Sequence, residues 1–181
     1  YKVGLAENFV PSSLNDDVMT LDNNSGFSLL KETTLYSKNL FCKRFPNAIK
    51  VDDGTTNKSI YLYKNGDNFY WWSDAERVYL PKDCSLLFKD CKANLLEIDS
   101  FKTTKTVDMS GMFSKCENLT ALDLSSFNTS NVTTMDGMFA SCPNLSHLDL
   151  NNFDTDNVTD MNSLFAGCAR LTSLDISNFN T

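Results

Sequence analysis

Apolar side chains recur at equal intervals through the carboxyl-terminal half of the chain. Phenylalanines stand 26 residues apart at four positions, Phe101, Phe127, Phe153 and Phe179. Three full copies of one sequence lie between them, and a degenerate copy precedes the first. A fixed period of this length is typical of stacked structural units, each of which covers the apolar face of its neighbour.

Each copy contains an apolar group that has helical spacing. In the second copy the residues at offsets 0, 3, 4 and 7 are Met135, Met138, Phe139 and Cys142. The other copies keep the same four slots, and the residues between them are small or polar. Offsets of this kind place side chains on one face of a helix, so the pattern predicts a short helix in every copy.

A second pattern follows in each copy and has a period of two. Leu148 and Leu150 alternate with His147, Asp149 and Asn151. This alternation predicts a short strand with one buried and one exposed face. The spacing LxxLxLxxF also matches the start of a leucine-rich repeat, with Phe in the Asn/Cys position. We expect the strands of successive copies to lie parallel to one another.

These patterns predict an α/β solenoid, a leucine-rich-repeat-like stack of short parallel strands and short helices with an amino-terminal β-rich cap. The predicted solenoid covers residues 81–181, with one degenerate coil, three full coils and a truncated carboxyl end. Residues 1–80 form the non-repeat cap. Within the cap, segment 59–73 predicts a hairpin around Asn65-Gly66. We expect the repeats to continue in a longer parent protein.

The repeat has a recognisable sequence motif. The run NVTTMDGMFASCPNLSHLDLNNFDTDNVTDM, with YWWSDAERVYLPKD and SLLFKDC before it, resembles the BspA-family leucine-rich-repeat surface proteins of bacteria. The resemblance covers residues 41–181, although Lys105 and Thr106 depart from the Asn-Val of the later copies. It implies an exported protein of the cell surface, associated with adhesion to host or matrix proteins or to other cells. It supplies no catalytic residue.

The exposed positions of the predicted strands form the candidate ligand-facing surface. They are Glu97, Ala121, Asp123, His147, Asp149, Asn151, Ser173 and Asp175. The acidic positions among them permit two interpretations: a stripe for a cation or a basic ligand, or carboxylates that bond the backbone or are simply solvated. We favour the second. A Ser–His–Asp arrangement around His147 is conceivable, but an open surface and the lack of a G-x-S-x-G sequence argue against catalysis.

Two further groups permit a functional and a structural interpretation. Trp71 and Trp72 form a candidate aromatic surface for sugar stacking, or they pack the cap on the first coil. Cysteines recur in one slot of each copy, at Cys91, Cys116, Cys142 and Cys168. No two of the six cysteines are closer than seven residues, so paired zinc-ligand spacing is missing. We favour core packing for the cysteines, over a disulfide ladder or a metal site.

The charge composition limits the classes of binding partner. The chain of 181 residues carries 16 basic and 23 acidic side chains, a net charge of −7. This balance disfavours nucleic acid and anionic membrane surfaces. We therefore expect a non-catalytic, secreted or cell-surface protein that binds a host or matrix protein, without a cofactor, a metal or membrane insertion of this segment. A passive spacer or stalk and a carbohydrate-binding module are the alternatives, and the oligomeric state stays open.

Overall fold

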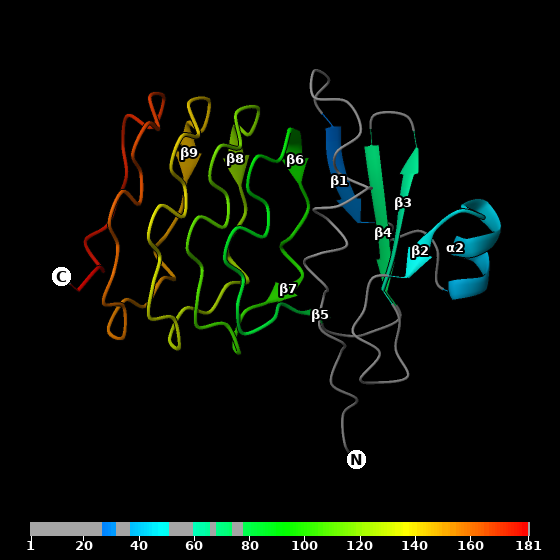
Figure 1. Cartoon of the computed structure of the whole chain (residues 1–181), viewed down its shortest axis with the longest axis horizontal. Helices are drawn as coiled ribbons and strands as arrows, with labels where there is room; N and C mark the ends of the chain where they lie inside the picture. Colours follow the sequence, from blue (N-terminus) through cyan, green and yellow to red (C-terminus); the bar gives the residue numbers. More distant parts are fainter. Residues whose placement is uncertain (1–26, 32–36, 51–59, 66–67, 74–77, 181) are drawn as a thin grey trace, which may run out of the picture.

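The computed structural model describes residues 27–31, 37–50, 60–65, 68–73 and 78–180. These residues form nine β-strands and one α-helix. Figure 1 shows a series of chain turns lying side by side at one end of the molecule and a twisted sheet with the helix at the other end. The turns come from the repeats, and most of the sheet comes from the residues that precede them.

The larger sheet has five strands in the order β2-β3-β4-β1-β6. Their bounds are β1 Phe27–Lys31, β2 Ile49–Lys50, β3 Ile60–Asn65, β4 Asn68–Ser73 and β6 Ala93–Leu96. Strands β3 and β4 are antiparallel, with Asn65 opposite Asn68, which confirms the predicted hairpin. Its turn residues 66–67 lie outside the described residues. Strand β1 is parallel to both β4 and β6, so the sheet takes strands from both sides of residue 80.

Helix α2, Lys38–Arg44, packs an aromatic cluster against the hairpin. Its amino terminus is capped by Ser37, whose Oγ accepts a hydrogen bond from the N–H of Leu40. Phe41 is fully buried, and its ring lies 6.0 Å from that of Trp72 in β4. The cluster consists of Phe41, Phe45, Tyr61 and Trp72.

Trp71 lies on the other face of β4, because neighbouring residues of a strand point to opposite faces. Its ring lies 5.0 Å from that of Phe101, and its Nε1–H donates to the carbonyl oxygen of Glu97. Trp71 therefore belongs to the long core of the repeats, whereas Trp72 belongs to the cluster under α2. The two tryptophans join the sheet to two separate cores.

The remaining strands are very short. Strand β5, Val78–Tyr79, pairs in parallel with β7, Phe101–Lys102, and β8, Ala121–Leu122, pairs in parallel with β9, His147–Leu148. Each of these pairs is a separate two-stranded sheet. Residues 74–77, which precede β5, lie outside the described residues.

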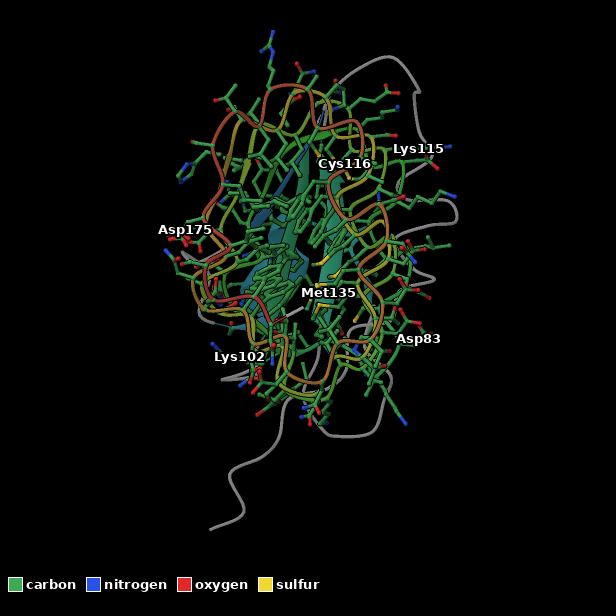
Figure 2. All side chains as sticks on the ribbon, turned by 90° about the vertical axis from the view of Figure 1, so that its left-hand side faces the viewer. Asp83, Lys102, Lys115, Cys116, Met135 and Asp175 are labelled. Carbon is green, nitrogen blue, oxygen red and sulfur yellow. The ribbon has the colours of Figure 1, made fainter. Side chains whose placement is uncertain are left out.

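The repeats are joined through a stack of phenylalanine rings. The rings of Phe88, Phe113, Phe139 and Phe165 follow one another at centroid distances of 5.4, 5.7 and 5.7 Å and are parallel to within 6°. Methionine and cysteine side chains fill the core beside them, and Figure 2 shows that Met135 lies inside the ring of the chain. Equivalent positions of successive copies thus lie against one another, as the 26-residue period predicts.

The predicted fold class is wrong. The described part of the chain contains short strands in one five-stranded and two two-stranded sheets, and its only helix, α2, lies outside the repeats. An α/β solenoid with a short helix and a parallel strand in every coil is therefore not what these residues form. The segment expected to be helical, from Met135 to Cys142, consists of turns.

Backbone geometry explains why the segment is not helical. Two residues of each copy have positive φ: Gly137 at 58° and Ser141 at 58° in the second copy, and the equivalent residues in the others. A helix needs negative φ throughout. The N–H groups of Gly137, Phe139 and Ser141 donate to the next copy, at 2.6–3.0 Å from the carbonyl oxygens of residues 162, 164 and 166. In a helix those N–H groups would bond four residues back along the same segment.

Candidate functional site

Seven of the candidate residues are exposed and form one surface, called the strand face: Ala121, Asp123, His147, Asp149, Asn151, Ser173 and Asp175. In the first two copies the leucines between them point inward, with Leu148 6% and Leu150 1% exposed, whereas in the third copy Leu174 is half-buried and Ile176 is 45% exposed. The alternation of buried and exposed positions confirms the period-two pattern in the first two copies. The parallel pairing of β8 and β9 sets Ala121 beside His147, so equivalent positions of neighbouring repeats lie side by side.

Two adjoining depressions lie on the strand face. The first has a volume of about 420 Å³ and the second about 520 Å³. Ala121 and Asp123 line the first, Ser173 and Asp175 line the second, and His147, Asp149 and Asn151 line both. Parts of Leu122, Leu148 and Leu174 contribute apolar surface. The structure therefore brings candidate residues of three repeats together, with those of the middle repeat lining both depressions.

Glu97 is the exception among the candidates. It follows β6, is half-buried, and does not line either depression. Its backbone carbonyl accepts the indole hydrogen bond of Trp71. Strand β6 pairs with β1 of the larger sheet and also contacts β8, so Glu97 lies next to the strand face without lining its depressions.

The three aspartates of the strand face each hold a local turn. Oδ1 of Asp123 accepts from the N–H of Ser125 at 2.9 Å, and Asp149 and Asp175 make the same bond to the residue two positions on, at 3.0 Å. Hydrogen bonds from Ser125 lower the pKa of Asp123, and hydrogen bonds from Ser177 lower the pKa of Asp175. Each of these carboxylates therefore bonds the backbone of its own repeat.

His147, Asp149 and Ser173 line one depression but do not form a triad. No hydrogen bond among the described residues joins His147 to Ser173 or to Asp149. Oδ1 of Asp149 is already used by the N–H of Asn151. A proton relay needs both links of the chain Ser–His–Asp, so the arrangement does not supply one.

The candidate aromatic surface is not on the surface. Trp71 is 1% and Trp72 3% exposed. A sugar ring stacks on an exposed aromatic face, and both faces of these rings are covered by protein. Trp71 therefore packs against the repeats, as the packing interpretation expected, whereas Trp72 packs under α2.

The cysteines are core residues with a shared bonding pattern. Each of Cys116, Cys142 and Cys168 places its Sγ 3.0–3.1 Å from the carbonyl oxygen of a phenylalanine of the preceding repeat. Burial raises the pKa of Cys84 and of Cys91 to about 12, which keeps both as thiols at neutral pH. All six cysteines are free, and the described residues contain no cluster of three or more metal-ligating side chains.

Sequence reasoning missed a ladder of buried threonines. Thr103, Thr129 and Thr155 are 0–2% exposed, and each Oγ1 donates to a backbone carbonyl of the following repeat. Each also accepts an N–H from that repeat. The sequence does mark these threonines, because every copy begins with Phe, one variable residue and Thr.

Asparagine amides also link the repeats. Nδ2 of Asn131 donates to the carbonyl of Thr104, and Nδ2 of Asn157 donates to that of Ser130. Both asparagines begin an N-x-T triplet. Their amide groups bond the preceding repeat, in agreement with a structural role for these triplets.

Stacked copies of one sequence, bonded through equivalent backbone and side-chain groups, define a repeat-containing protein. The chain belongs to the family described as "Mycoplasma protein of unknown function, DUF285", whose model matches residues 82–181. No curated protein and no solved structure matches it. In the described ranges no helix is long and apolar enough to span a membrane.

Proposed function

We propose that this chain is part of a non-catalytic bacterial cell-surface protein whose strand face binds a protein ligand of a host, a matrix or another cell. The observation that carries the proposal is the pair of adjoining depressions, about 420 and 520 Å³, that share His147, Asp149 and Asn151. An open surface of this kind suits a large partner better than a small substrate, which is normally enclosed.

The side chains of the strand face support specific recognition. The position occupied by Ala121, His147 and Ser173 changes its chemistry in every repeat, whereas the leucines beneath it do not. A constant core with a varying surface is what a binding stack of repeats requires. A passive spacer has no need of such variation.

The repeat sequence supports the location. Its resemblance to the BspA-family surface proteins supports a position outside the cell, secreted or held at the cell wall. Burial of four of the six cysteines is compatible with that place, because thiols shielded from solvent are poorly reactive in an oxidising environment. The carbohydrate alternative loses its basis, since Trp71 and Trp72 are covered.

Filling the depressions tests the proposal. A double variant, Ala121→Tyr with Ser173→Tyr, adds bulk to both depressions without changing the charge. The control variant, Ala166→Tyr with Ala169→Tyr, adds the same bulk at exposed sites that line neither depression. We expect the parent chain and the control to bind proteins of a host matrix extract and the first variant to lose that binding. Equal binding by all three chains contradicts the proposal.

A further inference from the structure

Charge is distributed unevenly on the strand face. Asp123, Asp149 and Asp175 supply one carboxylate per repeat, and none of them forms an ion pair with a described lysine or arginine. The residues that line the two depressions include no lysine or arginine at all. His147 is the only other ionisable side chain there. The depressions are thus acidic hollows with apolar parts.

The aspartates are fixed in place, and two of them are favoured in the charged form. One oxygen of each carboxylate accepts a backbone N–H, which holds the side chain at the rim of the depression. The hydrogen bonds that lower the pKa of Asp123 and Asp175 also favour the ionised form. The carboxylates are therefore already in position when a cationic group approaches, and binding does not have to order them.

We propose that the strand face binds an extended basic segment of a partner protein, with its lysine or arginine side chains directed at Asp123, Asp149 and Asp175. This inference rests on the proposed function and names the chemistry of the partner. Neighbouring parallel strands lie about 4.8 Å apart, and alternate side chains of an extended segment recur about every 6.6 Å. The flexible stems of lysine and arginine bridge that difference, and they also cover the apolar parts of Leu122, Leu148 and Leu174.

The arrangement suits a chain of cationic groups better than one bound metal ion. A hard cation requires about six oxygens around one point. Here each repeat contributes a single carboxylate, and one of its oxygens already accepts a backbone hydrogen bond. Charges repeated along an axis match a ligand whose own charges are repeated along its length.

A second row of aspartates in the same protein provides a matched control. Asp83, Asp108 and Asp160 each accept the N–H of the residue two positions on, at 2.8–3.0 Å. They line neither depression, and Figure 2 shows Asp83 and Asp175 on opposite sides of the stack. Asparagine retains a side-chain oxygen for the same turn, so Asp→Asn at either row removes the charge and keeps the turn.

The experiment compares two triple variants of the whole chain. One is Asp123→Asn, Asp149→Asn and Asp175→Asn, and the other is Asp83→Asn, Asp108→Asn and Asp160→Asn. The probe is a short fluorescein-labelled peptide of alternating lysine and serine, with an alternating glutamine and serine peptide as its neutral match. Fluorescence anisotropy gives the affinities, and circular dichroism confirms that both variants are folded.

We expect the lysine peptide to bind the parent chain and the neutral peptide not to bind. The strand-face variant should lose about tenfold or more in affinity, whereas the control variant should stay within about twofold of the parent. Equal losses in both variants would show attraction by net charge alone and would overturn the inference. Failure of the lysine peptide to bind the parent would overturn it as well. The proposed function survives either result if the tyrosine variant of the strand face still loses matrix binding.

Discussion

At the scale of single residues, the aspartates of the strand face combine two roles. Each carboxylate closes a local turn through one oxygen and presents charge through the other. The turn requires only an acceptor, whereas attraction of a cation requires the charge. Substitutions to asparagine and to alanine therefore separate the two roles, since asparagine removes the charge alone and alanine removes both.

Asp149 gives the first prediction. Asp149→Asn should leave the free energy of unfolding nearly unchanged, because the amide oxygen can still accept the N–H of Asn151. Asp149→Ala should lower it by about 1 kcal/mol, the usual net value of one hydrogen bond. Urea denaturation of the two variants and the parent measures the difference. Equal stabilities of the alanine and asparagine variants would show that the bond contributes nothing.

Asp123 gives a prediction about pH. Its pKa in the folded chain lies below the ordinary value of 3.8, because Ser125 donates hydrogen bonds to the carboxylate. A group with a lowered folded pKa stabilises the fold above its unfolded pKa, and this contribution is lost as the pH falls through the folded value. Asp123→Asn should therefore flatten the loss of stability below about pH 4. Parallel pH profiles for parent and variant would contradict the assignment.

At the scale of elements, the turn segments of the repeats depend on residues of positive φ. Gly111 and Ser141 hold two such positions, with φ of 59° and 58°. A side chain at positive φ costs roughly 1–2 kcal/mol, and a Cβ added at Gly111 would lie 2.6 Å from Cδ2 of Leu86. The equivalent of Ser141 in the last repeat is already a glycine, Gly167.

Opposite stability changes should follow at these two positions. Gly111→Ala should destabilise the chain by about 1–2 kcal/mol, and Ser141→Gly should stabilise it by up to about 1 kcal/mol. Thermal unfolding followed by circular dichroism measures both. A stabilising Gly111→Ala would mean that the segment adopts negative φ, as in the helix expected from its sequence.

The same segments show where sequence reasoning succeeds and where it fails. Alternation of leucine with polar residues was enough to assign the inward and outward positions of the strand face. Offsets of 0, 3, 4 and 7 fit a helix and a pair of turns equally well, because both put those side chains on one side. The bonds that decide between them run to the next repeat, and positions such as Lys115 and Ser141 have positive φ without being glycine.

Longer-range features were beyond the reach of the sequence. Nothing in the residues of β1 indicates that it lies between β4 and β6, because backbone pairing between distant segments has no local signature. The depressions of the strand face depend on how neighbouring repeats are set side by side, and only their residues could be predicted. The buried threonines were predictable in principle, from their fixed place in every copy.

At the scale of the whole molecule, stability should depend on position along the ring stack. Phe139 is fully buried between the rings of Phe113 and Phe165, each 5.7 Å away. Phe139→Ala should lower the free energy of unfolding by about 3–5 kcal/mol, as large-to-small core substitutions do. Phe165 is only partly buried, so Phe165→Ala should lower the free energy of unfolding by less. Denaturant unfolding of both variants tests the order, and a larger loss at Phe165 would contradict it.

Two cores meet at the hairpin, and Trp71 is one of the side chains that link the sheet to the stack. It contacts Phe101 and bonds the carbonyl of Glu97, whereas Trp72 reports on the cluster under α2. In a Trp71→Phe variant the ring contact is retained, so the fluorescence of Trp72 and the circular dichroism of the whole chain should change at the same denaturant concentration. In Trp71→Ala the contact is lost, while the pairing of β1 with β6 and the packing of Ile60 in the core of the repeats remain. The Trp72 transition should then separate from that of the whole chain. Coincident transitions in the alanine variant would show that these remaining contacts are enough to couple the sheet to the repeats.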